Sequence, residues 1–247
     1  MNVDPITPDA FPPQFTRWPL CDNLGYITLV DWMGGDEDAV QRARDCYNSW
    51  GKATPEKNEK LARKLIGDKP MHGTTTRGTV LKFKVKLPLF VREQLTRHLA
   101  GHVYESIGWS MGTHTMELAS AYDQMSLRYV DARTCDYYNP ATFRSLDEDQ
   151  AQVWMAAQKL SISSYEALRQ LGLTQEIARC FIPQNIYTEM NWTTNFQAIA
   201  DWAWKRMPRG GAQSEHTAYA VAAIDLMETF VSPIMVDAWK REVGWNA

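Results

Sequence analysis

The chain has 247 residues, 45% of them hydrophobic and 22% charged, which is the composition of a globular protein with a sizeable core. Its formal net charge of -3 provides no basic field for duplex nucleic acid or an anionic membrane, so we expect neither as a partner. Residues 1–15 lack the basic and apolar regions of a signal peptide, and no apolar run of about 18 residues could cross a membrane.

The cysteines stand apart in the sequence and form no CxxC pair, which structural zinc sites and dithiol redox sites require. His98 and His102 have helical spacing, but no third ligand accompanies them. We therefore expect reduced thiols, a cytoplasmic location and no metal site. The cysteines are Cys21, Cys46, Cys135 and Cys180.

The first half of the chain predicts two helices that follow a strand. Residues 1–24 are rich in proline, and we expect an extended arm that precedes a single catalytic domain of residues 25–247. Alternating β-branched residues predict a strand over residues 25–32. Helical spacing then predicts helices over residues 36–50 and 56–66.

Residues 74–88 alternate apolar side chains with lysines, and this pattern predicts a strand with one basic face toward solvent. Pro88 marks the start of the next helix, in which Gln94, Arg97 and His98 share one face. The lysines are Lys82, Lys84 and Lys86.

The second half predicts helices over residues 147–171, which could be one helix or two, and over 175–181, 193–206 and 212–242. The helix at 193 is expected to start at a threonine cap, Thr193 or Thr194, and the last helix is expected to kink at Pro233. We expect Trp192, Trp202 and Trp204 in the core or in subunit contacts, with stacking on a cofactor as the alternative for any one of them. The whole pattern predicts an α+β fold of one domain, with a small central sheet flanked by helices.

A nucleoside monophosphate site needs fixed cations for the phosphate and amides or hydroxyls for the base edge. Side chains of these types occur at separate points of the sequence, and their spacing alone does not bring them together. They are Gln94, Arg97, Ser126, Arg128, Arg179 and Arg206.

The sequence resembles the flavin-dependent thymidylate synthase family over roughly residues 27–242. Residues 86–98, KLPLFVREQLTRH, resemble the family segment that leads into an Arg-His-Arg signature. Residues 121–129, AYDQMSLRY, resemble the second half of that signature, and residues 100–118 form an insertion between the halves.

Two later stretches also resemble the family. Residues 178–195, ARCFIPQNIYTEMNWTTN, are similar to a family stretch without a gap. Residues 195–206 and 212–215 resemble the family's final ligand helix and the start of the next one.

The resemblance implies a homotetramer with active sites between subunits. It implies transfer of the one-carbon unit of methylene-tetrahydrofolate to C5 of dUMP, with NADPH reducing FAD and the reduced flavin completing the methyl group of dTMP. Arg206 is implied as the catalytic residue, which stabilises negative charge on the pyrimidine near N3. The residues implied at the deoxypyrimidine monophosphate are Gln94, Arg97, Gln124, Ser126, Leu127, Arg128, Arg179 and Arg206.

The residues implied at FAD are His72, Thr74, Arg97, His98, Leu99, Gln124, Asn195, Gln197 and Asp201. The lysines of the predicted strand ordinarily form a face in contact with solvent, and the alternative is that they guide the folate polyglutamate tail.

Several positions depart from the family pattern. Leu99 and Gln197 replace arginines, Arg77 replaces a glutamate, Gln124 replaces a glutamate, Asp201 replaces an asparagine, and His216-Thr217 replaces Ile-Arg.

Three functions stay open at this point. The first is an FAD- and folate-dependent thymidylate synthase with a changed flavin pocket. The second is a relative that hydroxymethylates C5 of dUMP or dCMP, a reaction that needs a carbon but no net hydride, or that methylates dCMP. The third is a non-catalytic nucleotide-binding relative, against which the presence of Arg206 argues, because a mere binder has little need to stabilise an ionised ring.

Overall fold

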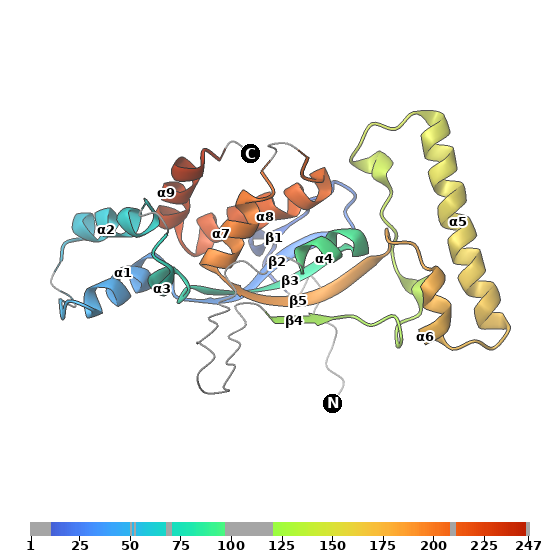
Figure 1. The fold of residues 1–247 in the computed structure, drawn as a ribbon, viewed down its shortest axis with the longest axis horizontal. Helices are drawn as coiled ribbons and strands as arrows, with labels where there is room; N and C mark the ends of the chain where they lie inside the picture. Colours follow the sequence, from blue (N-terminus) through green and yellow to red (C-terminus); the bar gives the residue numbers. More distant parts are fainter. Residues whose placement is uncertain are drawn as a thin grey trace, which may run out of the picture.

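The computed structural model describes residues 11–49, 51, 53–67, 71–96, 121–207 and 211–245. Within these residues the centre of the fold is an antiparallel sheet with the strand order β1-β2-β3-β5-β4 (Figure 1). The strands are β1 (Thr16–Arg17), β2 (Tyr26–Met33), β3 (Val80–Pro88), β4 (Ala121–Gln124) and β5 (Tyr187–Asn195). The predicted α+β class is confirmed.

The α-helices are α1 (Asp36–Asp45), α2 (Pro55–Gly67), α3 (Gly73–Thr76), α4 (Leu89–Leu95), α5 (Glu148–Gln170), α6 (Gln175–Ala178), α7 (Phe196–Trp204), α8 (Ser214–Phe230) and α9 (Pro233–Val243). Short 3-10 helices are η2 (Pro13–Phe15), η3 (Ala132–Thr134), η4 (Pro140–Thr142) and η5 (Arg179–Phe181). No helix among the described residues is both long and apolar enough to span a bilayer.

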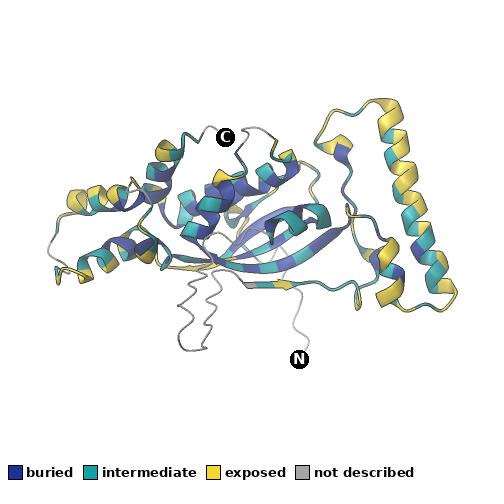
Figure 2. Ribbon diagram, viewed as in Figure 1, coloured by how far each residue is buried: buried dark blue, intermediate teal, exposed yellow. Residues whose placement is uncertain are grey.

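One face of the sheet carries the hydrophobic core. Leu81, Phe83, Val85 and Leu87 alternate along β3, and all are buried in a cluster with residues of α7 and α8. Figure 2 shows the same burial on the strands and on the sides of the helices that cover them. Removing these side chains from water supplies the main driving force that holds α7 and α8 on the sheet.

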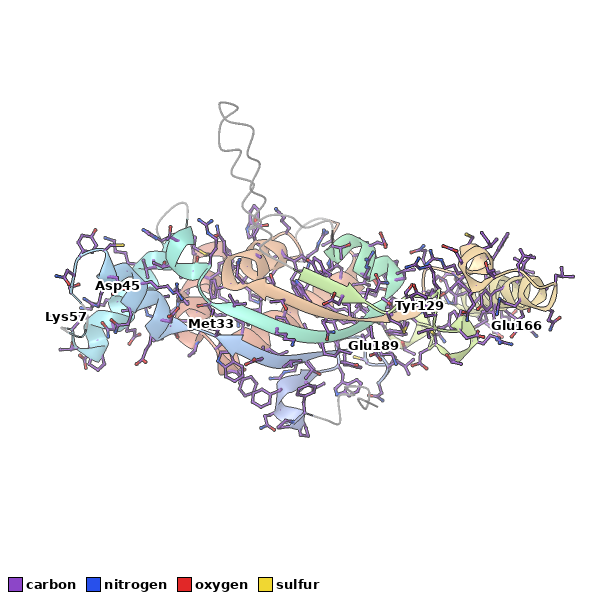
Figure 3. All side chains as sticks on the ribbon, turned by 90° about the horizontal axis from the view of Figure 1, so that it is seen from below. Met33, Asp45, Lys57, Tyr129, Glu166 and Glu189 are labelled. Carbon is purple, nitrogen blue, oxygen red and sulfur yellow. The ribbon has the colours of Figure 1, made fainter. Side chains whose placement is uncertain are left out.

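The opposite face of the sheet is polar, and no described helix covers it in the view of Figure 3, where Glu189 is labelled on this face. The lysines of β3 lie there as predicted, but two of them are paired with acids. Lys84 forms a 3.1 Å ion pair with Glu189, and Lys86 forms a 2.5 Å ion pair with Asp136. Their side chains are only 16% and 19% exposed, so two of the three charges are already neutralised within the chain.

The predicted helix over residues 193–206 is wrong at its start, because β5 continues to Asn195. Asn195 caps α7, and its Oδ1 accepts a 2.9 Å hydrogen bond from the backbone N–H of Ala198. Thr193 and Thr194, the predicted caps, are paired with β3 opposite Lys82 and Leu81.

Three other boundaries differ from the prediction. The strand expected from residue 74 begins at Val80, because residues 73–76 form α3. The helix expected to residue 50 ends at Asp45. The last predicted helix is two helices, since α8 ends at Phe230 and Pro233 starts α9 in a new direction rather than kinking one helix.

The ends of the molecule differ in character (Figure 1). Helices α1, α2 and α9 pack together at one end, and α5 projects at the other, where it contacts α6 and η5. Of the α5 residues only Tyr165 is buried.

The described part of the N-terminal segment adds β1 to the sheet through Thr16, which pairs with Thr28, and it buries Leu20 in the core. Most of the predicted insertion, 100–118, lies outside the described residues.

Candidate functional site

A cleft of about 390 Å³ lies where α4, β4 and η5 meet. It brings together four of the residues implied at the nucleotide, Gln124, Ser126, Leu127 and Arg179. Their side chains come from an edge strand, the turn after it and a 3-10 helix, so the fold assembles what the sequence keeps apart. The complete lining is Leu89, Arg92, Glu93, Gln124, Met125, Ser126, Leu127 and Arg179.

The pairing of β4 with β5 places the amide of Gln124. Gln124 stands opposite Met190, and its Nε2 donates a 3.1 Å hydrogen bond to the hydroxyl of the buried Thr188. Just beyond the strand, the backbone N–H of Met125 donates to the carbonyl of Glu189 at 2.9 Å. These bonds hold the chain on β5 up to the turn that carries Ser126.

Ser126 organises that turn. Its carbonyl accepts hydrogen bonds from the backbone N–H groups of Tyr129 and Val130, each at 3.0 Å, and its hydroxyl accepts one from the N–H of Arg128 at 3.3 Å. The side chain of Arg128, implied at the phosphate, does not line the cleft. Its guanidinium lies 5.2 Å from the ring centre of the neighbouring Tyr129.

Two arginines supply the positive charge of the cleft. Arg179 begins η5, and its Nε donates a 3.3 Å hydrogen bond to the carbonyl of Glu176. Arg92 lies on α4, where its Nη1 donates to Glu93 at 2.6 Å while its Nε is buried without a hydrogen-bond partner among the residues that the structure describes. A buried N–H without a partner is costly, and an anionic oxygen would satisfy it.

Arg92 is a site residue that the sequence interpretation missed. Leu89, Arg92 and Glu93 stand at i, i+3 and i+4 of one helix, so they form one face, and that face lines the cleft. Gln94, Arg97 and His98 have the same spacing, so a signal for the face of Arg92 is present in the sequence.

Gln94 points from α4 toward the start of α8 instead. Its Nε2 donates a 2.5 Å hydrogen bond to the side-chain oxygen of Gln213, and its Oε1 lies 3.0 Å from the Nδ1 of His216. The hydroxyl of Thr217 joins the same group, since it donates to the carbonyls of Arg206 at 2.8 Å and Gln213 at 3.3 Å.

Arg206 follows the end of α7 and is half-buried. Burial lowers the pKa of its guanidinium from the ordinary value, but an arginine still carries its positive charge at neutral pH. Thus the residues implied at the nucleotide form two neighbouring groups, one in the cleft and one at the start of α8, with α4 contributing to both. Arg97, implied at both ligands, lies outside the described residues.

The residues implied at FAD gather in part where α3 packs against α7. Thr74 lies on α3, and His72 is the residue that precedes this helix. Gln197 and Asp201 lie on α7. A Cβ added to Gly73 would meet the Oε1 of Gln197 at 2.9 Å, which shows how close the two helices are. The side chain of Asn195 is used to cap α7. His98 and Leu99 lie outside the described residues.

Gln197 and Asp201 line a second cleft of about 230 Å³. The lining also contains Trp204 and Trp239, and its described residues include two carboxylates, Asp201 and Glu242, but no lysine or arginine. Asp201 forms a 2.8 Å ion pair with Lys205. A diphosphate needs cations, and the described lining of this cleft supplies none, so these residues do not fit the diphosphate of FAD.

The described part of the chain contains neither a cluster of metal ligands nor a pair of bonded cysteines. No three His, Cys, Asp or Glu side chains there could hold a metal ion together. Each of the four cysteines is a free thiol. Trp192 and Trp202 are buried in the core, as predicted, whereas Trp204 is 51% exposed at the second cleft.

The fold has solved counterparts. Over 87% of this chain and 94% of the other, it is similar to the crystal structure of a UMP/dUMP methylase, PolB, from Streptomyces cacaoi bound with 5-Br dUMP, with a TM-score of 0.66 and 19% identity. The same enzyme bound with 5-Br UMP aligns with a TM-score of 0.64 and 20% identity over 87% of this chain and 93% of that one. At these identities the likeness shows the fold alone.

Sequence comparison identifies the family. The family model described as "Thymidylate synthase complementing protein" matches residues 28–232. A flavin-dependent thymidylate synthase from Kosmotoga olearia is 30% identical over 212 residues, covering 83% of this chain and 86% of that protein. One from Thermus thermophilus is 29% identical over 204 residues, covering 83% of this chain and 72% of that protein. The chain therefore belongs to the thymidylate synthase complementing protein family, as the sequence resemblance predicted.

Proposed function

We propose that the chain transfers a one-carbon unit from methylene-tetrahydrofolate to C5 of dUMP, giving dTMP. The observation that carries this proposal is the cleft in which Arg92, Ser126 and Arg179 meet. Guanidinium groups and a hydroxyl are the usual partners of a phosphate. The names of the relatives and the dUMP analogue bound to PolB agree with a nucleotide substrate.

The reaction would take place toward the start of α8, where Arg206 and Gln94 lie. A carbon electrophile is captured at C5 only when electron density is pushed there from the pyrimidine ring. A fixed, half-buried cation beside N3 and O2 favours the ionised ring, and its effect is stronger away from bulk water. We assign this role to Arg206, with Gln94 and Gln124 as amide partners of the nucleotide.

Completion of a methyl group needs a hydride as well as a carbon. The relatives are named flavin-dependent thymidylate synthases, and we infer that FAD reduced by NADPH supplies the hydride if the chain forms dTMP. The cations for the FAD diphosphate would have to lie outside the second cleft, whose lining holds Asp201 and Glu242.

That same acidic cleft favours a second candidate function, C5 hydroxymethylation of dUMP or dCMP. Here the methylene carbon joins C5, water supplies the hydroxyl group, and tetrahydrofolate leaves without any hydride being consumed. Loss of flavin affinity would then cost nothing, which matches Gln197 where the family resemblance implies arginine and Asp201 where it implies asparagine.

We also propose that the active form is a homotetramer with sites between subunits. No described helix covers the polar sheet face (Figure 3), and α5 exposes Val153 and Leu160 by 69% and 70%. Apolar residues on a projecting helix are typical of a surface that another chain covers. Light scattering on the purified protein gives the mass of the assembly, and a monomer at micromolar concentration would contradict this part.

The experiment that tests the function is a product assay by mass spectrometry. The protein is incubated with dUMP or dCMP and methylene-tetrahydrofolate, with and without FAD and NADPH. A methylated nucleotide that requires both reductants supports the first candidate, and a hydroxymethylated nucleotide formed without them supports the second. An unchanged nucleotide in every mixture, together with tight nucleotide binding, indicates a non-catalytic relative and overturns both.

A further inference from the structure

A fully buried histidine connects two helices to an amide of the proposed nucleotide site. His216 lies on α8 with none of its surface exposed, and its Nε2 accepts a 2.8 Å hydrogen bond from the indole Nε1 of Trp202 on α7. Its Nδ1 lies 3.0 Å from the Oε1 of Gln94 on α4. All three helices lie on the same face of the sheet (Figure 1).

The proton on the imidazole can be placed from these contacts. An indole N–H only donates, so the Nε2 of His216 must accept and carries no proton. The neutral ring then has its proton on Nδ1, which donates to the partner it faces, and that partner is the side-chain oxygen of Gln94.

The fixed tautomer also fixes the amide of Gln94. If the amide were turned over, its NH2 group would face the N–H of His216 and its oxygen would face the oxygen of Gln213. Only one orientation satisfies both neighbours, with the oxygen toward His216 and the nitrogen donating to Gln213 at 2.5 Å. The second N–H of Gln94 has no partner among the described residues.

We propose that His216 is a positioning residue that locks Gln94 as a hydrogen-bond donor toward the bound nucleotide. The nucleotide atom that faces Gln94 is then an acceptor, a carbonyl or phosphate oxygen, and never an amino group. This role rests on the proposed function, because it requires that the nucleotide binds beside Gln94. Holding the amide in advance removes the entropy that a free side chain loses on binding.

The lock belongs to this chain rather than to the family pattern. From the resemblance, isoleucine is expected at position 216, and isoleucine has no group that could orient an amide. A histidine there places two polar nitrogens in the core, which is unfavourable unless both are satisfied. Both find partners, and one of these partners is Gln94, a residue implied at the nucleotide.

Three substitutions separate the lock from mere packing. His216→Asn keeps a side-chain N–H near the position of Nδ1 and loses the acceptor for Trp202. His216→Gln keeps an acceptor near the position of Nε2 and loses the donor to Gln94. His216→Ile introduces the residue that the family resemblance implies. Melting temperature reports the packing cost, and titration calorimetry with dUMP reports the position of Gln94.

We expect both amide variants to lose similar thermal stability, because each leaves one buried polar group unsatisfied. The dissociation constant for dUMP should rise about 10-fold in His216→Gln and His216→Ile but no more than about 3-fold in His216→Asn, since one hydrogen bond is at stake. Affinities that follow stability instead, with Asn as weak as Gln, would show that His216 only packs.

Nitrogen NMR of the histidine rings tests the tautomer directly. The chain has five histidines, and the signal missing from His216→Asn assigns the ring. The expected spectrum shows a protonated Nδ1 and an unprotonated Nε2, and Trp202→Phe should release this preference. A protonated Nε2 in the wild type overturns the proposal. A wild type that binds no dUMP removes the proposed function itself, whereas a wild type that binds dUMP no better than His216→Ile removes only the role of His216.

Discussion

The side-chain hydroxyl of Thr217 donates a 2.8 Å hydrogen bond to the backbone carbonyl of Arg206. Thr217 lies in the first turn of α8, and Arg206 follows the last turn of α7. The bond therefore joins the ends of two helices directly and fixes the point from which the Arg206 side chain extends. The family resemblance implies arginine at position 217, so this contact is also a property of this chain.

Thr217→Val should loosen Arg206 while it keeps the shape of the side chain. Loss of one hydrogen bond predicts a fall in kcat of about 3- to 10-fold. It also predicts a loss of about 1 kcal/mol in the free energy of unfolding. Thr217→Ser keeps the hydroxyl and should retain most of the activity. Steady-state kinetics and chemical denaturation measure both effects, and equal activities for the two variants would refute the role of this bond.

Arg206→Ala should abolish turnover and leave dUMP binding largely intact. Its cation is assigned to charge that develops on the ring during the reaction, and loss of a group of that kind costs about 100-fold or more in kcat. Single-turnover kinetics measure the rate, and calorimetry measures the affinity. Undiminished turnover would contradict the assignment.

Arg179→Ala should weaken the binding of dUMP by about 10- to 100-fold, because a charge-assisted hydrogen bond to the phosphate is lost. Deoxyuridine, which has no phosphate, should bind equally to the wild type and the variant. Arg128→Ala is the matched control, since the Arg128 side chain lies over Tyr129 and does not line the cleft. We expect a smaller effect from the control, and the reverse order would move the phosphate toward the Arg128 turn.

Glu215 predicts an acid-sensitive contribution to stability. Burial alone would raise the pKa of this 2% exposed carboxyl, but its hydrogen bonds from Arg144 and Tyr138 lower it overall. A folded-state pKa below the unfolded value, about 4.3, means that the contribution is present above that pH and is lost as the pH falls further. Denaturation at a series of pH values should show this loss.

Arg144→Met is the matching variant. At pH 7 it leaves the Glu215 charge buried with its arginine partner removed, and with Arg144 itself 42% exposed we expect a loss of about 2–3 kcal/mol. The carboxyl of Glu215 should then have a raised pKa. The difference in unfolding free energy between wild type and variant should therefore become smaller as the pH falls toward 4. A difference that does not change with pH would rule out the ion pair as its source.

The double substitution of Gln197→Arg with Asp201→Asn should improve FAD binding. It removes one carboxylate from the second cleft and adds one cation, as the family resemblance implies. We expect at least about a 10-fold gain in FAD affinity, measured by flavin fluorescence quenching. Gln197→Asn with Asp201→Asn separates the effect of the cation from that of removing the carboxylate. No gain in either variant would mean that the flavin does not bind at this cleft.

Much of the sheet could be predicted because its physical signal is local. The alternation of Leu81, Phe83 and Val85 with lysines required a strand with one buried face, and Pro88 marked the helix that follows. β5 was not predicted, although the buried Met190, Trp192 and Thr194 alternate with partly buried residues along it. The strand has polar side chains on both of its faces, so its apolar pattern in the sequence is short, and its place in the sheet depends on pairing with β3 and β4.

The candidate site was predictable only in part. The family resemblance supplied Gln124, Ser126 and Arg179, and the fold brings them into one cleft. Arg92 was missed because a helix has several faces and the sequence does not say which one meets a ligand. The hydrogen bond between His216 and Gln94 joins residues 122 positions apart, so no local sequence pattern could predict it.

The short strand β4 places Gln124 in the cleft beside Arg92 and Arg179 through its register with β5. Its four residues pair with β5, so that Gln124 stands opposite Met190 and Asp123 opposite Asn191. Successive side chains of a strand alternate between faces. A slip of one residue would exchange an amide for a carboxylate in the lining that includes Arg92 and Arg179, whereas a slip of two residues would restore the face. The register of β4 against β5 therefore decides whether a neutral amide or a negative carboxylate lines the cleft beside its arginines.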